Sequence, residues 1–304
     1  MSGAPSVITV GTFDGVHRGH GLVVRRVALE ARRLGLRSVI ITFDRHPLAV
    51  LNPAAAPPIL TSEDEKAEIL SAFGVDEVAV VPFTTELASY EAEEFVDRVL
   101  LAQFGMRELF IGHDHGFGRG RSGDGATLDR LGKARGFGVH IVPPVEARDG
   151  KPVSSTSIRR AIAGGDLAKA ADGLGRLYSV SGTVIHGDNR GAKLGFRTVN
   201  TEIPPAPKLL PPDGVYVVRV TTPDGAFGGM MNLGGRPTFG DDSRRLEVHL
   251  FDATGDWYGA RIRVDLVTRL RYIRVFDGPE SLIAQLQSDE QASRVILARQ
   301  RAGF

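Results

Sequence analysis

Two histidines, His17 and His20, lie three residues apart in a glycine-rich turn at residues 11–20. The apolar run 7–10 before the turn predicts a buried strand, and residues 22–34 after it predict a helix. A strand, a glycine-rich turn and a helix N-terminus together present backbone N–H groups to a phosphate. Imidazoles hold and transfer protons near neutral pH, so the turn predicts chemistry on a polyphosphate.

The H-x-G-H spacing at residues 17–20 is neither the G-x-G-x-x-G dinucleotide-binding fingerprint nor a Walker loop. It is similar to the signature of the nucleotidyltransferase superfamily, in which two histidines face a triphosphate and support attack on its α-phosphate. A turn with two solvated histidines is the alternative, and this motif alone leaves both interpretations open. A zinc site is disfavoured, because zinc usually takes three or four protein ligands and the chain has no cysteine and no H-E-x-x-H motif.

Predicted strands and helices alternate up to about residue 175, which indicates an α/β Rossmann-like domain. The helix at 62–73 has Thr61 or Ser62 as its N-cap and Glu65 placed for a capping box. Strands separated by helices imply right-handed crossovers and a mainly parallel sheet, with ligands at the carboxyl ends of the strands. The strands are expected at 7–10, 38–43, 77–81, 109–111 and 139–142, and the helices at 22–34, 62–73, 92–104 and 124–135.

The unusual polar segments of this half fall at those strand ends. His46 follows the second strand, and the glycine-rich segment 112–118 follows the fourth, where the carboxylate of Asp114 can accept from a ribose or a base. A turn rich in glycine and histidine is the alternative for each segment. Hydroxyl residues in 154–159 precede another helix and are ordinary N-caps. That role is compatible with phosphate binding, because a helix N-terminus favours an anion and Arg159 can add a bidentate clamp.

The second half of the chain has a different pattern, and the change falls near residues 175–178. Short alternating runs separated by turn residues predict an antiparallel barrel or sandwich. We therefore expect two domains, residues 1–174 and 175–304, with a long C-terminal helix at about 279–299 packed on the barrel. The strands are expected at 178–185, 214–221, 228–233, 245–251 and 261–270.

Three residues of the second half could carry phosphoryl chemistry. If their segment is extended, Thr198 and Asn200 present their side chains on one face, where a hydroxyl and an amide oxygen can share a magnesium ion that bridges ATP phosphates. Cross-strand hydrogen bonding is the alternative. Glu247 lies in an alternating strand, where surface exposure is the commonest fate of a glutamate. A carboxylate that faces a closed site could instead act as general base on a primary hydroxyl.

In combination, residues 7–178 resemble the FMN adenylyltransferase module of prokaryotic bifunctional riboflavin kinase/FAD synthetases. Four motifs occur in family order: G-T-F-D-G-V-H-x-G-H at 11–20, T-F-x-x-H-P at 42–47, G-x-D-x-x-F-G at 112–118 with R-x-G-D at 121–124, and S-S-T-x-I-R at 154–159. The resemblance implies that His17, His20 and Arg159 act at the ATP phosphates. It also implies ATP or flavin contacts from Gly11, Thr12, Phe13, Asp14, Gly19, His46, Gly112, Asp114, Phe117, Ser155 and Thr156.

Residues 175–290 resemble the riboflavin kinase module of the same family. The matches include G-x-V-x-H-G-D-x-R-G at 182–191, L-G-F-x-T-x-N at 194–200, G-x-R-P-T-F at 234–239 and L-E-V-H-L at 246–250. The resemblance implies that Thr198 and Asn200 bind magnesium and ATP and that Glu247 is the catalytic base. It implies further ATP or flavin contacts from Gly187, Asp188, Arg190, Gly191, Lys193, Gly195, Phe196, Asn232, Arg236 and Thr238.

The chain departs from the family pattern at three places. Arg45 stands where the family usually has proline, and His115-Gly116 where it has Phe-Arg. The second change bears on flavin stacking or loop rigidity more than on phosphate chemistry. Arg197 replaces the proline of the Pro-Thr-x-Asn pattern, so the fixed φ of proline is lost and a charge is added beside the expected metal ligand.

Composition narrows the class of protein. The chain has 304 residues, 42% of them hydrophobic, and a net charge of +1 without a basic block, so nothing indicates a nucleic-acid partner. The absence of cysteine excludes disulfides and thiol catalysis. No signal-peptide pattern and no apolar run long enough to span a bilayer is visible, so we expect a cytoplasmic protein without a membrane partner. The composition says nothing about oligomeric state.

The resemblance implies an enzyme of FAD biosynthesis, a bifunctional transferase that phosphorylates riboflavin to FMN with ATP and then adenylylates FMN with a second ATP to FAD and pyrophosphate. Its expected partners are ATP and flavins, with Mg²⁺ as cofactor. One alternative is that only one activity is efficient, for instance because Arg197 weakens the kinase. A second is a flavin-binding regulator with vestigial sites. A third, an adenylyltransferase for a pantetheine or glycerol phosphate, does not explain the barrel half.

Overall fold

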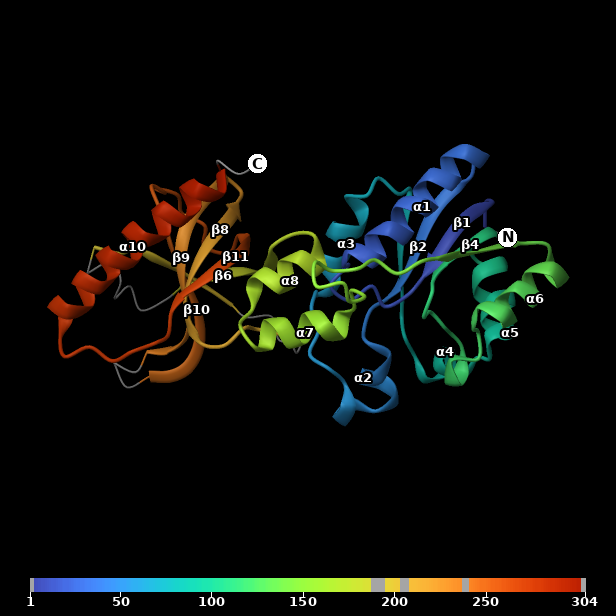
Figure 1. Cartoon of the computed structure of the whole chain (residues 1–304), viewed down its shortest axis with the longest axis horizontal. Helices are drawn as coiled ribbons and strands as arrows, with labels where there is room; N and C mark the ends of the chain where they lie inside the picture. Colours follow the sequence, from blue (N-terminus) through green and yellow to red (C-terminus); the bar gives the residue numbers. More distant parts are fainter. Residues whose placement is uncertain (1–2, 187–194, 203–207, 237–240, 302–304) are drawn as a thin grey trace. The chain divides into compact units, whose positions relative to one another are not determined.

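The computed structural model describes residues 3–186, 195–202, 208–236 and 241–301 of the chain (Figure 1). The chain divides into two compact units, one made of Met1–Ser157 with Ala206–Lys208 and the other of Ile158–Pro205 with Leu209–Phe304. The domain boundary expected between residues 174 and 175 stays a prediction. In the described part of the chain, no helix has both the length and the apolar character that crossing a membrane requires.

The first unit contains a five-stranded sheet with the order β3-β2-β1-β4-β5, and all neighbouring strands are parallel. The predicted parallel sheet is therefore confirmed. The central strand is buried along its whole length, as is typical of a strand with both faces covered. The strands are β1 (Ser6–Val10), β2 (Arg37–Phe43), β3 (Glu77–Val81), β4 (Met106–Gly112) and β5 (Gly138–Val142).

Alternate residues of β1 face two apolar cores, because successive side chains of a strand point to opposite faces of the sheet. Val7 belongs to one core with Val24 and Val27, two residues of α1 (Arg18–Leu34). Ile8 belongs to the other core with Phe95 and Leu100. Full burial of such a side chain contributes about 1.5–3 kcal/mol, so the packing fixes the end of β1 where the turn 11–20 begins.

The predicted helices of the first unit are present. Ser62 and Glu65 form the expected capping box at the start of α3. The helix expected at 92–104 begins as α5 and continues as a π-helical turn, and its expected apolar residues Phe95, Val99 and Leu100 are buried. The helices are α3 (Glu63–Ser71), α5 (Ala92–Phe95) with the π turn Val96–Leu101, and α6 (Gly125–Arg135).

Several short helices were not predicted, because a helix of one or two turns has too few residues to show a 3.6-residue period. They are α2 (Pro47–Leu51), α4 (Thr85–Ser89), α8 (Leu167–Leu174) and the 3₁₀ turns Pro53–Ala55 and Arg119–Arg121. The helix expected near 154–159 is α7 (Ser155–Ala163).

The second unit contains a closed antiparallel barrel with the order β10-β7-β6-β11-β8-β9. The sequence left a barrel and a sandwich open, and the barrel is correct; closure leaves no free sheet edge. The predicted C-terminal helix α10 (Pro279–Arg301) lies along the barrel in Figure 1, and Leu297 packs in one cluster with Val217 and Met230. The strands are β6 (Tyr178–Ile185), β7 (Thr198–Thr201), β8 (Gly214–Thr222), β9 (Gly225–Arg236), β10 (Asp241–Leu250) and β11 (Arg261–Arg271).

Candidate active sites

The glycine-rich turn of the first unit places its histidines at the start of α1. His17 is the N-cap of this helix, and its Nδ1 accepts a hydrogen bond from the backbone N of His20 at 3.3 Å. An accepting Nδ1 carries no proton, so the neutral His17 ring carries its proton on Nε2. The cap thus fixes both the tautomer and the orientation of one imidazole at the positive end of a helix of 17 residues.

The two imidazoles stack on each other. Their ring centroids lie 3.6 Å apart with an interplanar angle of 16°, and Phe13 contacts His20 edge-on at 5.1 Å. A Cβ on Gly19 would lie 3.1–3.2 Å from two atoms of the His17 ring, so glycine leaves room for the pair. His17 is only 8% exposed, which does not fit a turn with two solvated histidines.

The backbone of the turn is strained. Phe13 and Val16 have positive φ angles of 46° and 37°, a region that a β-branched residue rarely adopts. Hydrogen bonds from Val16 N to Phe13 O and from Gly15 N to Thr61 Oγ1, both 3.0 Å long, hold this conformation. Residues kept in such regions cluster at functional sites, and the surrounding structure must stabilise them.

Asp14, predicted to contact the ligand, anchors the turn to the segment before α3. Its carboxylate accepts from Leu60 N at 2.8 and 3.1 Å and from Thr61 N at 3.1 Å, and the residue is 6% exposed. Ser155, another predicted site residue, donates from Oγ to the backbone O of Asp14 at 2.9 Å. The structure therefore brings the S-S-T segment to the same turn.

A cavity of about 140 Å³ opens beside the turn. Lys66 lines it and was not predicted as a site residue, because the sequence around it indicated only the capping box of a helix. Lys66 is 7% exposed, and its Nζ donates to the backbone O of Phe43 at 2.5 Å and of Thr12 at 3.4 Å. Burial lowers the pKa of Lys66 below its ordinary 10.5, while the carboxylates of Asp14, Glu63 and Asp44 oppose the shift. The polar lining residues are Thr12, Asp14, Asp44, Arg45, His46, Thr61, Glu63 and Lys66.

The departure at Arg45 forms an ion pair on this cavity. Arg45 Nε lies 2.9 Å from Asp44 Oδ2, and Phe83 N donates to Asp44 Oδ1 at 2.8 Å. Although burial raises the pKa of Asp44, these two interactions lower it below the ordinary 3.8 overall. His46 caps α2, and its Nδ1 accepts from Leu48 N at 3.2 Å.

The loop after β4 holds an exposed carboxylate and a half-buried ring. The side chain of Asp114 is 80% exposed, and Gly112 is the last residue of β4. His115, the departure in this loop, is half-buried, and the loss of hydration at its ring together with the nearby charge of Arg121 lowers its pKa to about 4. It is therefore a neutral ring at neutral pH, 5.8 Å from the ring of Phe117. Phe117 in turn contacts Phe95 of the core at 5.0 Å.

Two further predicted residues lie on α7. Thr156 is exposed and belongs to the first unit, whereas Arg159 belongs to the second. The described structure therefore does not place Arg159 relative to the two histidines.

In the second unit, strand register brings three predicted site residues to one face of the barrel. Glu247 on β10 pairs with Asn200 on β7 and with Asn232 on β9. Paired residues of antiparallel strands point to the same face. The neighbours Leu246 and Val248 are 1% and 0% exposed and fill the barrel interior, so the three polar residues lie on its outer face. Thr198 is two residues before Asn200 in the same strand, which confirms the extended conformation assumed from the sequence.

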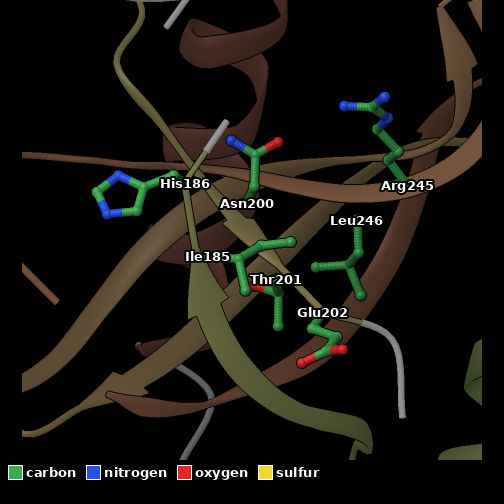
Figure 2. Close-up of a pocket in the computed structure, with 7 residues that line it drawn as sticks. All are labelled: Ile185, His186, Asn200, Thr201, Glu202, Arg245 and Leu246. Atoms are coloured by element: carbon green, nitrogen blue, oxygen red, sulfur yellow. The ribbon is translucent and has the colours of Figure 1, made fainter. Parts of the chain in front are cut away.

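A cavity of about 220 Å³ adjoins Asn200 (Figure 2). Figure 2 shows Asn200, Glu202, Arg245 and His186 among the side chains that line it. The ring of His186 stacks on Tyr258 with centroids 3.8 Å apart. Complete small-molecule sites usually measure about 300–1,000 Å³, so this cavity and that of the first unit are each smaller than a complete site.

The backbone at Arg197, the third departure, is held by a neighbouring histidine. His249 Nδ1 donates to the backbone O of Arg197 at 2.7 Å, while the Arg197 side chain is exposed. The His249 ring also contacts Phe196, 8% exposed, at 5.3 Å. Gly195 before it has a positive φ of 83°. This bond supplies a constraint at the position where the family has proline.

Some predicted site residues have no described side chain. Arg236 ends β9, and only its backbone is described. The following lie outside the described residues: Gly187, Asp188, Arg190, Gly191, Lys193 and Thr238.

Two family models match the chain in series, FAD synthetase over residues 2–157 and riboflavin kinase over residues 174–297. A bifunctional riboflavin kinase/FMN adenylyltransferase from Pseudomonas fluorescens is 37% identical over 293 residues, 96% of this chain and 93% of that protein. The protein of the same description from Listeria monocytogenes is 38% identical, over 96% of this chain and 93% of that protein. That of Escherichia coli K12 is 36% identical, over 97% and 94%.

A solved structure described as a macrolide-efflux protein from Streptococcus pneumoniae is similar to this chain with a TM-score of 0.84 and 32% identity, over 96% of this chain and 94% of that chain. Both units, their motifs and the near full-length relatives agree with the two family models. This chain therefore belongs to the family of bifunctional riboflavin kinase/FMN adenylyltransferases.

Proposed function

We propose that this enzyme makes FAD from riboflavin in two steps, phosphorylation in the barrel unit and adenylylation in the α/β unit. The observation that carries the proposal is that one chain holds both clusters, the stacked His17–His20 pair after β1 and the Glu247–Asn200 register pair on the barrel. The relatives whose names state both activities match the chain over both clusters. The efflux description of the structural neighbour is not carried over, because neither cluster provides chemistry for it.

In the kinase step, Glu247 takes the proton of the primary ribityl hydroxyl of riboflavin. The oxygen attacks the γ-phosphate of ATP, the bond to the β-phosphate oxygen breaks, and FMN and ADP result. Glu247 is suited to this role because its register partners are neutral amides, which can hold a hydroxyl or a phosphate without cancelling the charge of the base. Asn232 is proposed to orient the substrate beside it.

Thr198 and Asn200 fit a magnesium ion. Their side-chain oxygens share one face of β7, and hard oxygen ligands are those that Mg²⁺ prefers. The described residues contain no cluster of three or more His, Cys, Asp or Glu that could hold a metal ion, which is consistent with an ion held by one or two protein oxygens together with substrate phosphates. Bound there, Mg²⁺ would offset charge that develops on the transferred phosphoryl group.

In the adenylyltransferase step, a phosphate oxygen of FMN attacks the α-phosphate of ATP, and pyrophosphate leaves. His17 and His20 are proposed to stabilise the charge on the phosphate oxygens, with His17 donating from Nε2. Arg159 and the S-S-T segment add the phosphate contacts that the family resemblance implies. Lys66 and His46 line the adjoining cavity, where a cation and a ring N–H suit a nucleotide or flavin phosphate.

The other residues predicted to contact ATP or flavin remain proposals. Two structural features favour activity of both units over a single efficient one: His249 holds the backbone of Arg197, and His115 is a neutral ring in the place of phenylalanine.

Because both reactions consume ATP, we expect the enzyme to work in the cytoplasm.

The test is to incubate the pure protein with riboflavin, ATP and Mg²⁺ and to separate the flavins by chromatography. We expect FMN to form first and FAD to follow. A parallel reaction with FMN in place of riboflavin isolates the second step. Neither FMN nor FAD in the first reaction would reject the proposal, and flavin that binds tightly without turnover would favour a flavin-binding regulator.

A further inference from the structure

A buried ion pair of the first unit joins two residues that lie 143 positions apart in the sequence, Lys208 and Glu65. Their side chains are 1% and 3% exposed. Lys208 belongs to the first unit, although the riboflavin kinase model spans its position and the FAD synthetase model ends at residue 157. Burying two charges is expensive, so such a pair is weak support for stability and suggests a role in fixing a conformation.

The pair holds the short segment that precedes α3. Lys208 Nζ donates to the backbone O of Leu60 at 2.7 Å, and Glu65 Oε2 accepts from the backbone N of Ser62 at 2.9 Å. The backbone of Lys208 also forms a parallel β-bridge with Ile59. The segment 59–62 is thus fixed on one side by the ion pair.

On its other side the same segment holds the catalytic turn. Leu60 N and Thr61 N donate to the Asp14 carboxylate, and Thr61 Oγ1 accepts from Gly15 N. Gly15 precedes Val16, whose positive φ the surroundings must maintain, and His17 follows directly. Ile59 and Thr61 also line the cavity beside the turn. A shift of the segment would therefore move both the histidines and the wall of the cavity.

We propose that Lys208 is a positioning residue for nucleotidyl transfer, which it supports by fixing the segment 59–62 that anchors the H-x-G-H turn. The proposal rests on the adenylyltransferase function proposed above. The stretch of chain matched as riboflavin kinase thereby supplies a side chain on which the other activity depends.

The test uses the full-length protein with FMN and ATP. Lys208→Met removes both donated hydrogen bonds but leaves Glu65 buried without its cation, so this variant can fail to fold. The variant Glu65→Gln with Lys208→Gln keeps a polar side chain and removes the charge at each of these two positions. We expect the kcat of FMN adenylylation in this double variant to fall about tenfold or more, because small displacements of reacting groups are costly. The KM values for FMN and ATP should change less than threefold, and riboflavin phosphorylation should stay within twofold.

The matched control is Asp129→Asn with Lys133→Gln, which removes an exposed ion pair of the same unit and should leave both activities unchanged. Asp14→Asn provides a second readout. The variant that combines Asp14→Asn with the Glu65/Lys208 substitutions should have a kcat no lower than that of whichever of the two separate variants is slower, because both sets of substitutions act through the segment 59–62. A folded Glu65/Lys208 variant with native kcat, a raised KM at native kcat, or additive effects with Asp14→Asn would each overturn the proposal. Absence of FAD with the unaltered protein would instead overturn the proposed function.

Discussion

His115 makes the first unit sensitive to acid, and the effect can be calculated. Its pKa is about 4 in the folded protein because the half-buried ring loses hydration and lies near the charge of Arg121, against an ordinary value of 6.5. Between these values the unfolded chain binds the proton more readily, so stability falls as the pH drops from about 6.5 towards 4. At about 1.36 kcal/mol per pKa unit, the loss approaches ~3 kcal/mol at the lower end and is about 2 kcal/mol at pH 5.

The substitution His115→Phe should remove this loss. Phenylalanine keeps a ring beside Phe117 and does not titrate. When the pH is lowered from 7.5 to 5, the melting temperature of the first unit should fall in both proteins. The fall should be about 4–8 °C smaller in the variant, because about 1 kcal/mol corresponds to 2–4 °C for a unit of this size. Calorimetry at both pH values measures the difference. The single tryptophan, Trp257, lies in the second unit, so its fluorescence follows that unit as an internal reference.

His113→Phe is the matched control, because the side chain of His113 is 44% exposed in the same loop. It should leave the pH dependence unchanged. If His115→Phe and the unaltered protein lose the same stability between pH 7.5 and pH 5, the argument from burial is wrong.

Three other substitutions test separate contacts. Lys66→Met keeps the buried aliphatic stem but loses the hydrogen bonds to the carbonyls of Phe43 and Thr12. In steady-state assays, kcat/KM for FMN adenylylation should therefore fall about tenfold to a hundredfold while riboflavin phosphorylation stays unchanged. An equal loss of both activities would contradict this. His249→Phe removes the hydrogen-bond donor to the Arg197 carbonyl but keeps an aromatic ring, so the KM for ATP in the kinase reaction should rise several-fold. Adding Arg197→Pro should partly restore the KM, because proline fixes φ at this position. No restoration would argue that His249 does not act by holding the Arg197 backbone. Ser62→Ala breaks the capping box and should lower the free energy of unfolding of the first unit by about 1 kcal/mol, measured by thermal melting. An unchanged free energy of unfolding would show that the cap does not stabilise the unit.

The fold was largely predictable because its signals are local. The alternation at β6 and β8, the capping box at Ser62 and the apolar runs of β1 and β2 each lie within a few consecutive residues, and the structure has the elements they predict. The stacking of the two histidines did not follow from helical spacing, because His17 is the extended N-cap of α1 and the helix begins only at Arg18.

The contacts that support the sites were not predictable, because they join distant parts of the chain. Nothing near Lys208 shows that its ammonium group lies on Glu65, and nothing near Asp14 shows that its carboxylate caps the backbone of Leu60 and Thr61. Lys66 follows three acidic residues, a pattern typical of a solvated helix start, yet it is buried against a strand end. The partial burial of His115 likewise depends on tertiary packing that a glycine-rich loop sequence does not reveal.

The most direct test of the account is the flavin product pattern of two variants, His20→Ala and Glu247→Gln, each supplied separately with riboflavin and with FMN in the presence of ATP and Mg²⁺. The account predicts that His20→Ala accumulates FMN from riboflavin and makes little FAD from either substrate. It predicts that Glu247→Gln leaves riboflavin unconverted but still makes FAD from FMN. If either variant converts riboflavin to FAD at the native rate, the assignment of one reaction to each unit is wrong.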